Sequence, residues 1–413
     1  MIGRVGPAFL SAVLLVAACA PAVPTGAVRD PGTTSGDPSA AAPARTEVPI
    51  PGHEVYGFVP YWEMDDGIAD HLARTDLTTL ALFSVTHRRN GALAVTQNGY
   101  RRIAGGQGER LIREAHERGA RVEIVYSSFG EEKNRRFYTE PDAQARWIDE
   151  LVALVGDLGA DGVNVDVEAL PAEHVVDYGA FIGRLRTALR ERTPDARVSV
   201  ATTANERGAA MAVAAAAAGA DRIFLMGYDY HWEGSDPGAS SPLDRLDGAT
   251  KDLVWSLDLY AALGVPVERT ILGLPLYGMT WPVLGPGFGS PATGRGDHWI
   301  PRLNLRVFED PAFEPTYEPI ESVEFYSVPA PPGGSAQPGP SAEPGTSVEP
   351  GLSAEPGWNA VYYDSPRSLT PKLALADARG LAGAGFWAIG YERGLPGYRE
   401  LIATFRAGDL TPP

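Results

Sequence analysis

The sequence has a single cysteine, Cys19, among 413 residues. One cysteine excludes a disulfide within the chain and any zinc site built on several cysteines. No H-E-x-x-H or similar histidine spacing occurs, so we expect neither a metal nor another cofactor. Clustered Lys and Arg are also missing and the net charge is −17, which excludes a function based on nucleic-acid phosphates. The acidic balance favours a neutral or cationic substrate.

The first nineteen residues have the form of an export signal. Arg4 precedes an apolar run over residues 8–16, and small residues lead to Cys19. The run is shorter than the ~20 residues of a membrane-spanning helix. Its end resembles a bacterial lipobox, so we predict residues 1–19 to be a lipoprotein signal with lipidation at Cys19. The predicted location is extracytoplasmic, on the cell membrane; a plain cleaved signal with a chance cysteine is the alternative.

Two segments are too poor in large apolar residues to fold by themselves. Residues 20–48 are mostly Pro, Ala, Gly, Thr, Ser and Asp, and we predict a disordered tether. Residues 329–357 contain three near-repeats of the form S-x-E-P-G. Because this stretch interrupts a folded region, we interpret it as a surface loop, with an interdomain linker as the alternative.

Between these segments, short apolar runs alternate with helix-like stretches. The predicted strands are Val55–Pro60, Leu77–Val85, Arg121–Tyr126, Gly162–Val167, Arg197–Thr202, Arg222–Met226, Thr270–Leu274 and Gly385–Ala388. The clearest predicted helices are Asp142–Leu158, Val175–Arg192 and Leu243–Leu263. Eight such alternations predict an α/β fold, a (β/α)8 TIM barrel over residues 49–410, with an inserted subdomain at 279–365 between strands seven and eight. A doubly wound open sheet is the alternative, but no Gly-rich phosphate loop follows an early strand.

The fourth predicted strand carries the most informative pattern, Asp161-Gly-Val-Asn-Val-Asp-Val-Glu168. Because side chains alternate along a strand, Asn164, Asp166 and Glu168 share one face and three valines share the other. Buried carboxylates are costly unless they are paired, so an inward-facing row of them is hard to explain structurally. Glu168 would also end its strand, where barrel active sites assemble. An edge strand with its polar face in water would show the same alternation.

This run resembles the D-G-x-D-x-D-x-E signature of glycoside hydrolase family 18, the chitinase-like barrels. Six further segments resemble motifs of that family and occur in the same order along the chain. They are Tyr56–Trp62, Leu80–Ser84, Tyr126–Gly130, Leu225–His231, Leu272–Gly278 and Gly385–Ala388.

The resemblance implies a retaining β-N-acetylhexosaminidase whose nucleophile is the N-acetyl group of the substrate. By this resemblance, Glu168 transfers the proton. Asp166 accepts a hydrogen bond from the acetamide N–H and stabilises the positive charge of the intermediate, and Tyr228 donates a hydrogen bond to the acetamide oxygen. The substrate-binding residues it implies are Asn164, Met226, Asp229, Trp387, Phe58 and Phe83. Core packing for Trp387 and a structural turn at Tyr228 and Asp229 are the alternatives.

Asn164 departs from the family pattern, which usually has Asp at this position. The D-G-V-N-x-D-x-E form resembles bacterial members that include spore-cortex-lytic glucosaminidases. The expected partner is therefore a polysaccharide containing N-acetylglucosamine (GlcNAc), either chitin or peptidoglycan, and the chain is expected to be a monomer. A non-catalytic, lectin-like surface protein is the alternative, although such proteins typically lack the acid at the position of Glu168.

Overall fold

The computed structural model describes residues 52–246, 248, 251–330 and 357–410. The predicted signal with Cys19, the tether and most of the repeat-containing loop lie outside these residues. Within the described ranges, no helix is both long and apolar enough to cross a bilayer.

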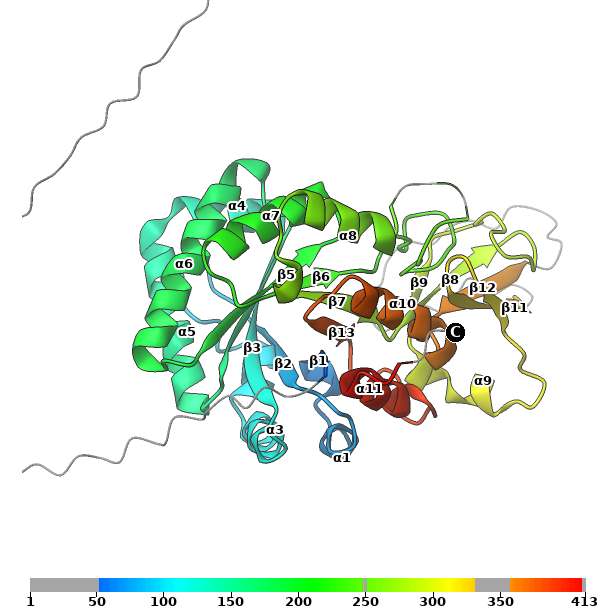
Figure 1. Ribbon diagram of the computed structural model, residues 1–413, viewed down its shortest axis with the longest axis horizontal. Coiled ribbons are helices and arrows are strands. Elements are labelled where there is room, and N and C mark those ends of the chain that lie inside the picture. The colour runs from blue at the N-terminus through cyan, green and yellow to red at the C-terminus, as the bar shows by residue number, and fades with distance from the viewer. Residues whose placement is uncertain (1–51, 247, 249–250, 331–356, 411–413) are drawn as a thin grey trace, which may run out of the picture. The chain divides into compact units, whose positions relative to one another are not determined.

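Eight parallel strands close into a barrel, in the order β1-β13-β7-β6-β5-β4-β3-β2 (Figure 1). These strands are β1 (Glu54–Pro60), β2 (Thr79–Val85), β3 (Arg121–Phe129), β4 (Gly162–Glu168), β5 (Arg197–Thr203), β6 (Arg222–Met226), β7 (Thr270–Pro275) and β13 (Gly383–Trp387). Each coincides with one of the predicted strands to within two residues at its start and three at its end. The predicted TIM barrel is confirmed.

Helices follow the strands around the barrel. They are α1 (Ile68–Leu72), α2 (Asn98–Ile103), α3 (Gly106–Glu117), α4 (Glu131–Thr139), α5 (Pro141–Leu158), α6 (Val175–Arg192), α7 (Glu206–Ala217), α8 (Leu253–Ala262), α10 (Pro366–Ala378) and α11 (Tyr398–Ala407). The helix α5 shows why the sequence pattern is readable. Pro141 occupies its first turn, Trp147 and Leu151 are fully buried on one face, and Gly159 ends it at φ 67°.

The helix predicted over Leu243–Leu263 is ten residues too long at its start. Asp252 begins α8 instead, because its side chain accepts a hydrogen bond from Trp255 N at 2.7 Å. Upstream, Leu243 N donates to Glu321 O at 2.9 Å, so that part of the chain is bound to the insertion.

The insertion between β7 and β13 forms its own antiparallel sheet, in the order β10-β11-β12-β8-β9. Its strands are β8 (Gly278–Val283), β9 (Asp297–Trp299), β10 (Thr316–Glu318), β11 (Val323–Pro329) and β12 (Trp358–Tyr363), with the short helix α9 (Leu305–Glu309) between β9 and β10. Arg302 of the insertion pairs at 2.6 Å with Glu63, a buried residue that follows β1. The pair links the insertion to the end of the barrel at which β1 finishes.

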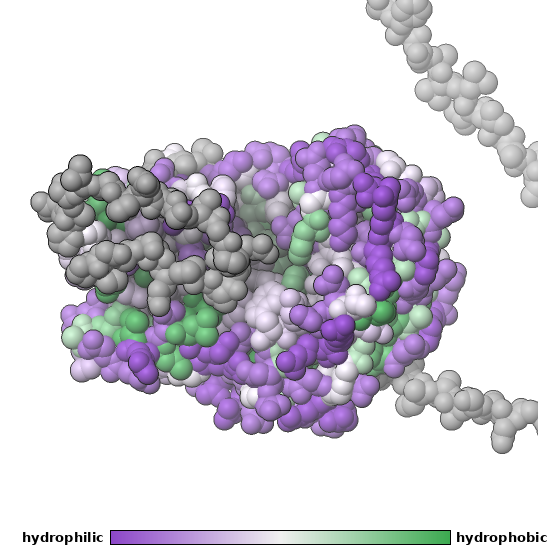
Figure 2. All heavy atoms as spheres, turned by 180° about the vertical axis from the view of Figure 1, so that it is seen from behind, coloured by the Kyte–Doolittle hydropathy of each residue, from purple (hydrophilic) through white to green (hydrophobic). Residues whose placement is uncertain are grey.

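Alternation along β4 separates two packing layers, as expected. Val163, Val165 and Val167 are buried in the layer between strands and helices, which also contains Leu151 and Phe181. The inward layer holds aromatic side chains such as Phe58 and Phe224. Burying each valine stabilises the fold by about 1.5–3 kcal/mol, which fixes the register of β4 and directs its polar residues inward. On the face shown in Figure 2, hydrophilic residues cover most of the surface.

Candidate active site

The three polar residues of β4 point into the barrel at increasing height. Asn164 is fully buried, Asp166 is 5% exposed, and Glu168 is half-buried at the last position of the strand. Asp166 and Glu168 line a cleft of about 980 Å³. A cleft of this size suits a ligand larger than one sugar ring.

Glu168 is held in place by a buried amide from α4. Asn134, which is fully buried, donates from Nδ2 to the main-chain oxygen of Glu168 at 2.5 Å. Ser128 Oγ donates in turn to Asn134 Oδ1 at 2.7 Å. These bonds fix the end of β4, so the carboxyl group of Glu168 has a defined position in the cleft.

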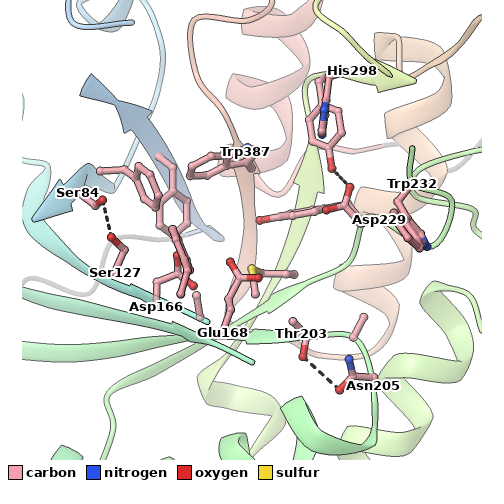
Figure 3. Close-up of a pocket in the computed structure, with 18 of the residues that line it drawn as sticks. Ser84, Ser127, Asp166, Glu168, Thr203, Asn205, Asp229, Trp232, His298 and Trp387 are labelled. Atoms are coloured by element: carbon pink, nitrogen blue, oxygen red, sulfur yellow. Dashed lines mark hydrogen bonds between the residues drawn. The ribbon is translucent and has the colours of Figure 1, made fainter. Parts of the chain in front are cut away.

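Burial and a neighbouring carboxyl group raise the pKa values of two acids in the cleft. Burial, and then the charge of Glu168, raise the pKa of Asp166 well above its ordinary value. Burial, and then the charge of Asp229, raise the pKa of Glu168. A carboxyl group that keeps its proton toward neutral pH can act as a general acid. Figure 3 shows Glu168 between Asp166 and Asp229.

The segment after β6 supplies a hydroxyl and a carboxylate. Asp229 adopts a left-handed backbone conformation (φ 62°), which is uncommon for a residue other than glycine. Its main-chain N–H donates to Ser240 Oγ at 3.1 Å, and its Oδ1 accepts the hydroxyl hydrogen of Tyr277. Burial, and then the charge of Asp229, raise the pKa of Tyr228 well above its usual range. Tyr228 therefore remains a hydroxyl donor at any physiological pH.

Aromatic rings form an apolar wall on the β1–β13 side. The ring of Trp387, at the end of β13, lies 4.7 Å from Phe83 and 5.6 Å from Phe58, measured between centroids. Trp62 packs near Trp387 and is 48% exposed. Half-exposed indole rings beside carboxyl groups are suited to stacking on the apolar faces of sugars.

The structure brings together all but one of the non-terminal residues that the sequence singled out. The cleft is lined by Glu168, Asp166, Tyr228, Asp229, Met226, Trp387, Phe58 and Phe83. Asn164 is the exception, because it is fully buried below Asp166 and does not line the cleft. The predicted role of Asn164 in substrate binding therefore stays a prediction. Cys19 lies outside the described residues.

Sequence reasoning missed several residues of the cleft. Trp232 and Phe129, which are 48% and 47% exposed, line it together with His298 of the insertion and Lys133 of α4. Tyr277 contacts Asp229 and belongs to the G-L-P-L-Y-G segment, so a signal for it was present. Phe129 belongs to the Tyr126–Gly130 segment, so a signal for it was present as well. For Trp232, His298 and Lys133, only the packing of distant segments reveals the position. Among the described residues, no three His, Cys, Asp or Glu side chains are grouped to hold a metal ion.

Comparison with known proteins gives a family for this geometry. The family model "Glycosyl hydrolases family 18" matches residues 54–392. Rat di-N-acetylchitobiase is 21% identical over 307 residues, which are 69% of this chain and 74% of that protein. The cortical fragment-lytic enzyme of Bacillus subtilis (strain 168) is 25% identical over 222 residues, 52% of this chain and 48% of that enzyme.

A solved structure has the same fold. The family 18 chitinase of Cycas revoluta in complex with (GlcNAc)3 superimposes with a TM-score of 0.67 at 17% identity, covering 87% of this chain and all of that chain (100%). Across the first curated relatives, the matched region covers between 36% and 74% of the relative's own length.

Proposed function

Since the chain belongs to glycosyl hydrolases family 18 and is a glycoside hydrolase, we propose that it cleaves β-1,4-linked GlcNAc polymers by a retaining, substrate-assisted mechanism. One observation carries this proposal. Glu168, Asp166 and Tyr228 converge in a single cleft whose wall includes Trp387. The raised pKa of Glu168 suits a proton donor, and the raised pKa of Tyr228 keeps its hydroxyl hydrogen in place.

In the first step, the acetamido oxygen of the sugar stacked on Trp387 attacks its own anomeric carbon. Glu168 gives its proton to the glycosidic oxygen, and the bond to the leaving sugar breaks. The raised pKa of Glu168, caused by burial and then by the charge of Asp229, makes the carboxyl group keep its proton to higher pH than an ordinary glutamic acid. The products are the free leaving sugar and a cyclic, positively charged oxazolinium.

Asp166 and Tyr228 stabilise the developing ring. Asp166 Oδ1 is buried and has no hydrogen-bond partner among the described residues, so it can accept the acetamido N–H. Tyr228 donates its hydroxyl hydrogen to the acetamido oxygen and holds it below the anomeric carbon. In the second step, Glu168 removes a proton from water, which opens the oxazolinium and restores the original anomeric configuration.

The experiment compares wild type with Glu168→Gln, which keeps the shape of the side chain and removes its proton chemistry. Both are incubated with chito-oligosaccharides and with purified peptidoglycan glycan strands, and products are identified by mass spectrometry. We expect the variant to lose roughly 10²–10⁴-fold in kcat while retaining binding. If wild type bound either polymer and cut neither, the lectin-like alternative would replace the enzyme assignment for these polymers.

We also propose that the chain works outside the cytoplasmic membrane, tethered by a lipid on Cys19. The proposal depends on the sequence alone, because that cysteine follows an export-type apolar run. Cys19→Ser should move the protein from the membrane fraction to the soluble fraction. Retention of the variant on the membrane would refute lipidation.

A further inference from the structure

The chain contains only three lysines, and two of them have carboxylate partners. Lys372 is fully buried and contacts Asp364 at 2.5 Å, and Lys251 pairs with Glu206 at 3.4 Å. The third, Lys133, forms no ion pair with any carboxylate of the described residues. Its Nζ donates one hydrogen bond, to Thr86 Oγ1 at 2.7 Å. An ammonium group without a carboxylate partner among the described residues is unexpected in a chain of net charge −17.

Lys133 lies in the proposed active-site cleft. It is half-buried and lines the cleft with Thr86, Ser127 and Phe129. Burial lowers its pKa to about 8, and no neighbouring carboxylate opposes that shift. The amine is therefore still mostly charged at neutral pH, with two of its three N–H donors available to a ligand.

The position of Lys133 relative to the reacting centre is fixed by its neighbours. Asn134, the next residue of α4, donates to the main-chain oxygen of Glu168 at 2.5 Å. Thr86, which accepts from Lys133, donates in turn to the carbonyl of Ser127 at 2.7 Å. Lys133 is thus held on the β2–β3 side of the cleft, one residue along α4 from the amide that fixes Glu168.

We propose that Lys133 is a specificity residue that binds a carboxylate on the sugar next to the one stacked on Trp387. This inference rests on the proposed function and narrows its substrate to an acidic strand in which N-acetylglucosamine alternates with its lactyl ether, N-acetylmuramic acid. In such a strand both neighbours of each GlcNAc bear an acidic substituent. Lys133 can therefore contact an acidic substituent in either orientation of the strand in the cleft.

The acidity of the whole chain does not prevent this recognition. Repulsion between distant charges is screened beyond about 8 Å at physiological ionic strength. An ammonium–carboxylate contact inside a cleft is a short, charge-assisted hydrogen bond and is screened much less. The carboxylate belongs either to the lactyl group itself or to a peptide attached to it, and both present the same chemistry.

The test compares matched strands that differ only in charge. One set is peptide-free glycan strands with free lactyl carboxylates, and its partner set has those carboxyls converted to neutral amides. A second pair is peptide-bearing strands, with and without the same conversion. The measured quantity is the ratio of kcat/KM for the acidic strand to that for its neutral partner, in wild type, Lys133→Met and Lys133→Arg.

We expect wild type to prefer one acidic strand over its amide by roughly tenfold, because a hydrogen bond to a charged group is worth that much. Lys133→Met should bring the ratio close to one, and Lys133→Arg, which keeps the charge, should restore much of it. Arg113→Gln is the matched control, because it removes the same unit of charge from an exposed site on α3. If wild type prefers the acidic strand in the peptide-free pair, Lys133 binds the lactyl carboxylate. If the preference occurs only in the peptide-bearing pair, Lys133 binds a carboxylate of the peptide.

The inference fails if the wild-type ratio is near one in both pairs, or if Lys133→Met leaves it unchanged. It also fails if wild type cleaves chito-oligosaccharides and neither kind of strand, although the proposed glycosidase function would then stand. Cleavage of none of these polymers would overturn both. A fall in activity on acidic and neutral strands alike in Lys133→Met would show a structural role and would also refute carboxylate recognition.

Discussion

Glu168 and Asp229 lie in one cleft, at the end of β4 and just after β6, and burial together with the charge of Asp229 raises the pKa of the Glu168 carboxyl. Asp229 in turn accepts a hydrogen bond from Tyr277, which precedes the insertion. The pKa of the proposed general acid, Glu168, therefore depends in part on Asp229, which does not have to contact the scissile bond.

Asp229→Asn should shift the upper limb of the pH profile of kcat/KM toward lower pH. Without the charge of Asp229, Glu168 releases its proton at a lower pH, so the fraction of enzyme with a competent acid declines earlier. The profile is measured on a soluble chito-oligosaccharide or glycan strand. Ser240→Ala is the control, because it removes a neutral partner of Asp229 and leaves the charge. An upper limb that stays in place in the Asn variant would contradict the interaction.

Tyr228→Phe should reduce kcat by roughly 100-fold and change KM little. The substitution removes one hydroxyl that, in the proposed mechanism, donates to the acetamido oxygen as the ring closes. Because the pKa of Tyr228 is raised by burial and by Asp229, no deprotonated form complicates the profile of the wild type. Steady-state kinetics on one substrate gives both constants. A variant with a higher KM and an unchanged kcat would indicate that Tyr228 binds the substrate equally in the ground state and the transition state.

Asn164→Asp should destabilise the protein more at pH 7 than at pH 4. Position 164 is fully buried, and neither polar atom of its side chain has a hydrogen-bond partner among the described residues. An Asp there would have a folded-state pKa raised by burial and by nearby Asp166, so stability is lost as pH rises above the unfolded-state value. Thermal melts of variant and wild type at both pH values measure the difference. An equal shift in Tm at the two pH values would contradict this reasoning.

Glu123→Gln should remove part of the pH dependence of stability. Glu123 is 1% exposed inside the barrel, where Tyr56 donates to its Oε2 at 2.5 Å and Ser199 to its Oε1 at 2.9 Å. Burial raises its pKa from 4.5 to about 7. Because the folded protein binds this proton more tightly than the unfolded chain, the protonated carboxyl group stabilises the fold fully below pH 4.5. The contribution is about 3 kcal/mol, at 1.36 kcal/mol per pKa unit, and it is lost as the pH rises to about 7.

Denaturant unfolding at pH 4.5 and pH 7.5 tests the prediction for Glu123. Between pH 4.5 and pH 7.5 wild type should lose unfolding free energy through the ionisation of Glu123, and the Gln variant should not lose this part. The loss in the variant should therefore be smaller by up to about 3 kcal/mol. Glu109→Gln, at an exposed position of α3, serves as the control for removing one carboxyl group. Identical pH dependence in wild type and Glu123→Gln would show that Glu123 does not titrate as described.

The strands of the barrel could be predicted because each is a short apolar run between turn residues, and β4 could be oriented because its valines alternate with polar residues. The start of α8 could not, because Leu243 is apolar and helix-compatible but is bound instead to Glu321 of the insertion. The alternation gave the inward direction of Asn164 but not its depth: it is fully buried and does not line the cleft. Lys133 and His298 reach the cleft from segments whose sequences carry no pattern that points there.

The central claim is that the acetamido group of the substrate is the nucleophile, and the most direct test uses partially N-acetylated chito-oligosaccharides, in which some sugars lack the acetyl group. After brief digestion, the sugar at each newly formed reducing end is identified by mass spectrometry. The mechanism predicts that every new reducing end is N-acetylglucosamine, because only that sugar can form the oxazolinium that Asp166 and Tyr228 stabilise. New reducing ends that are often unacetylated glucosamine would contradict it, because cleavage would then need no acetamido group.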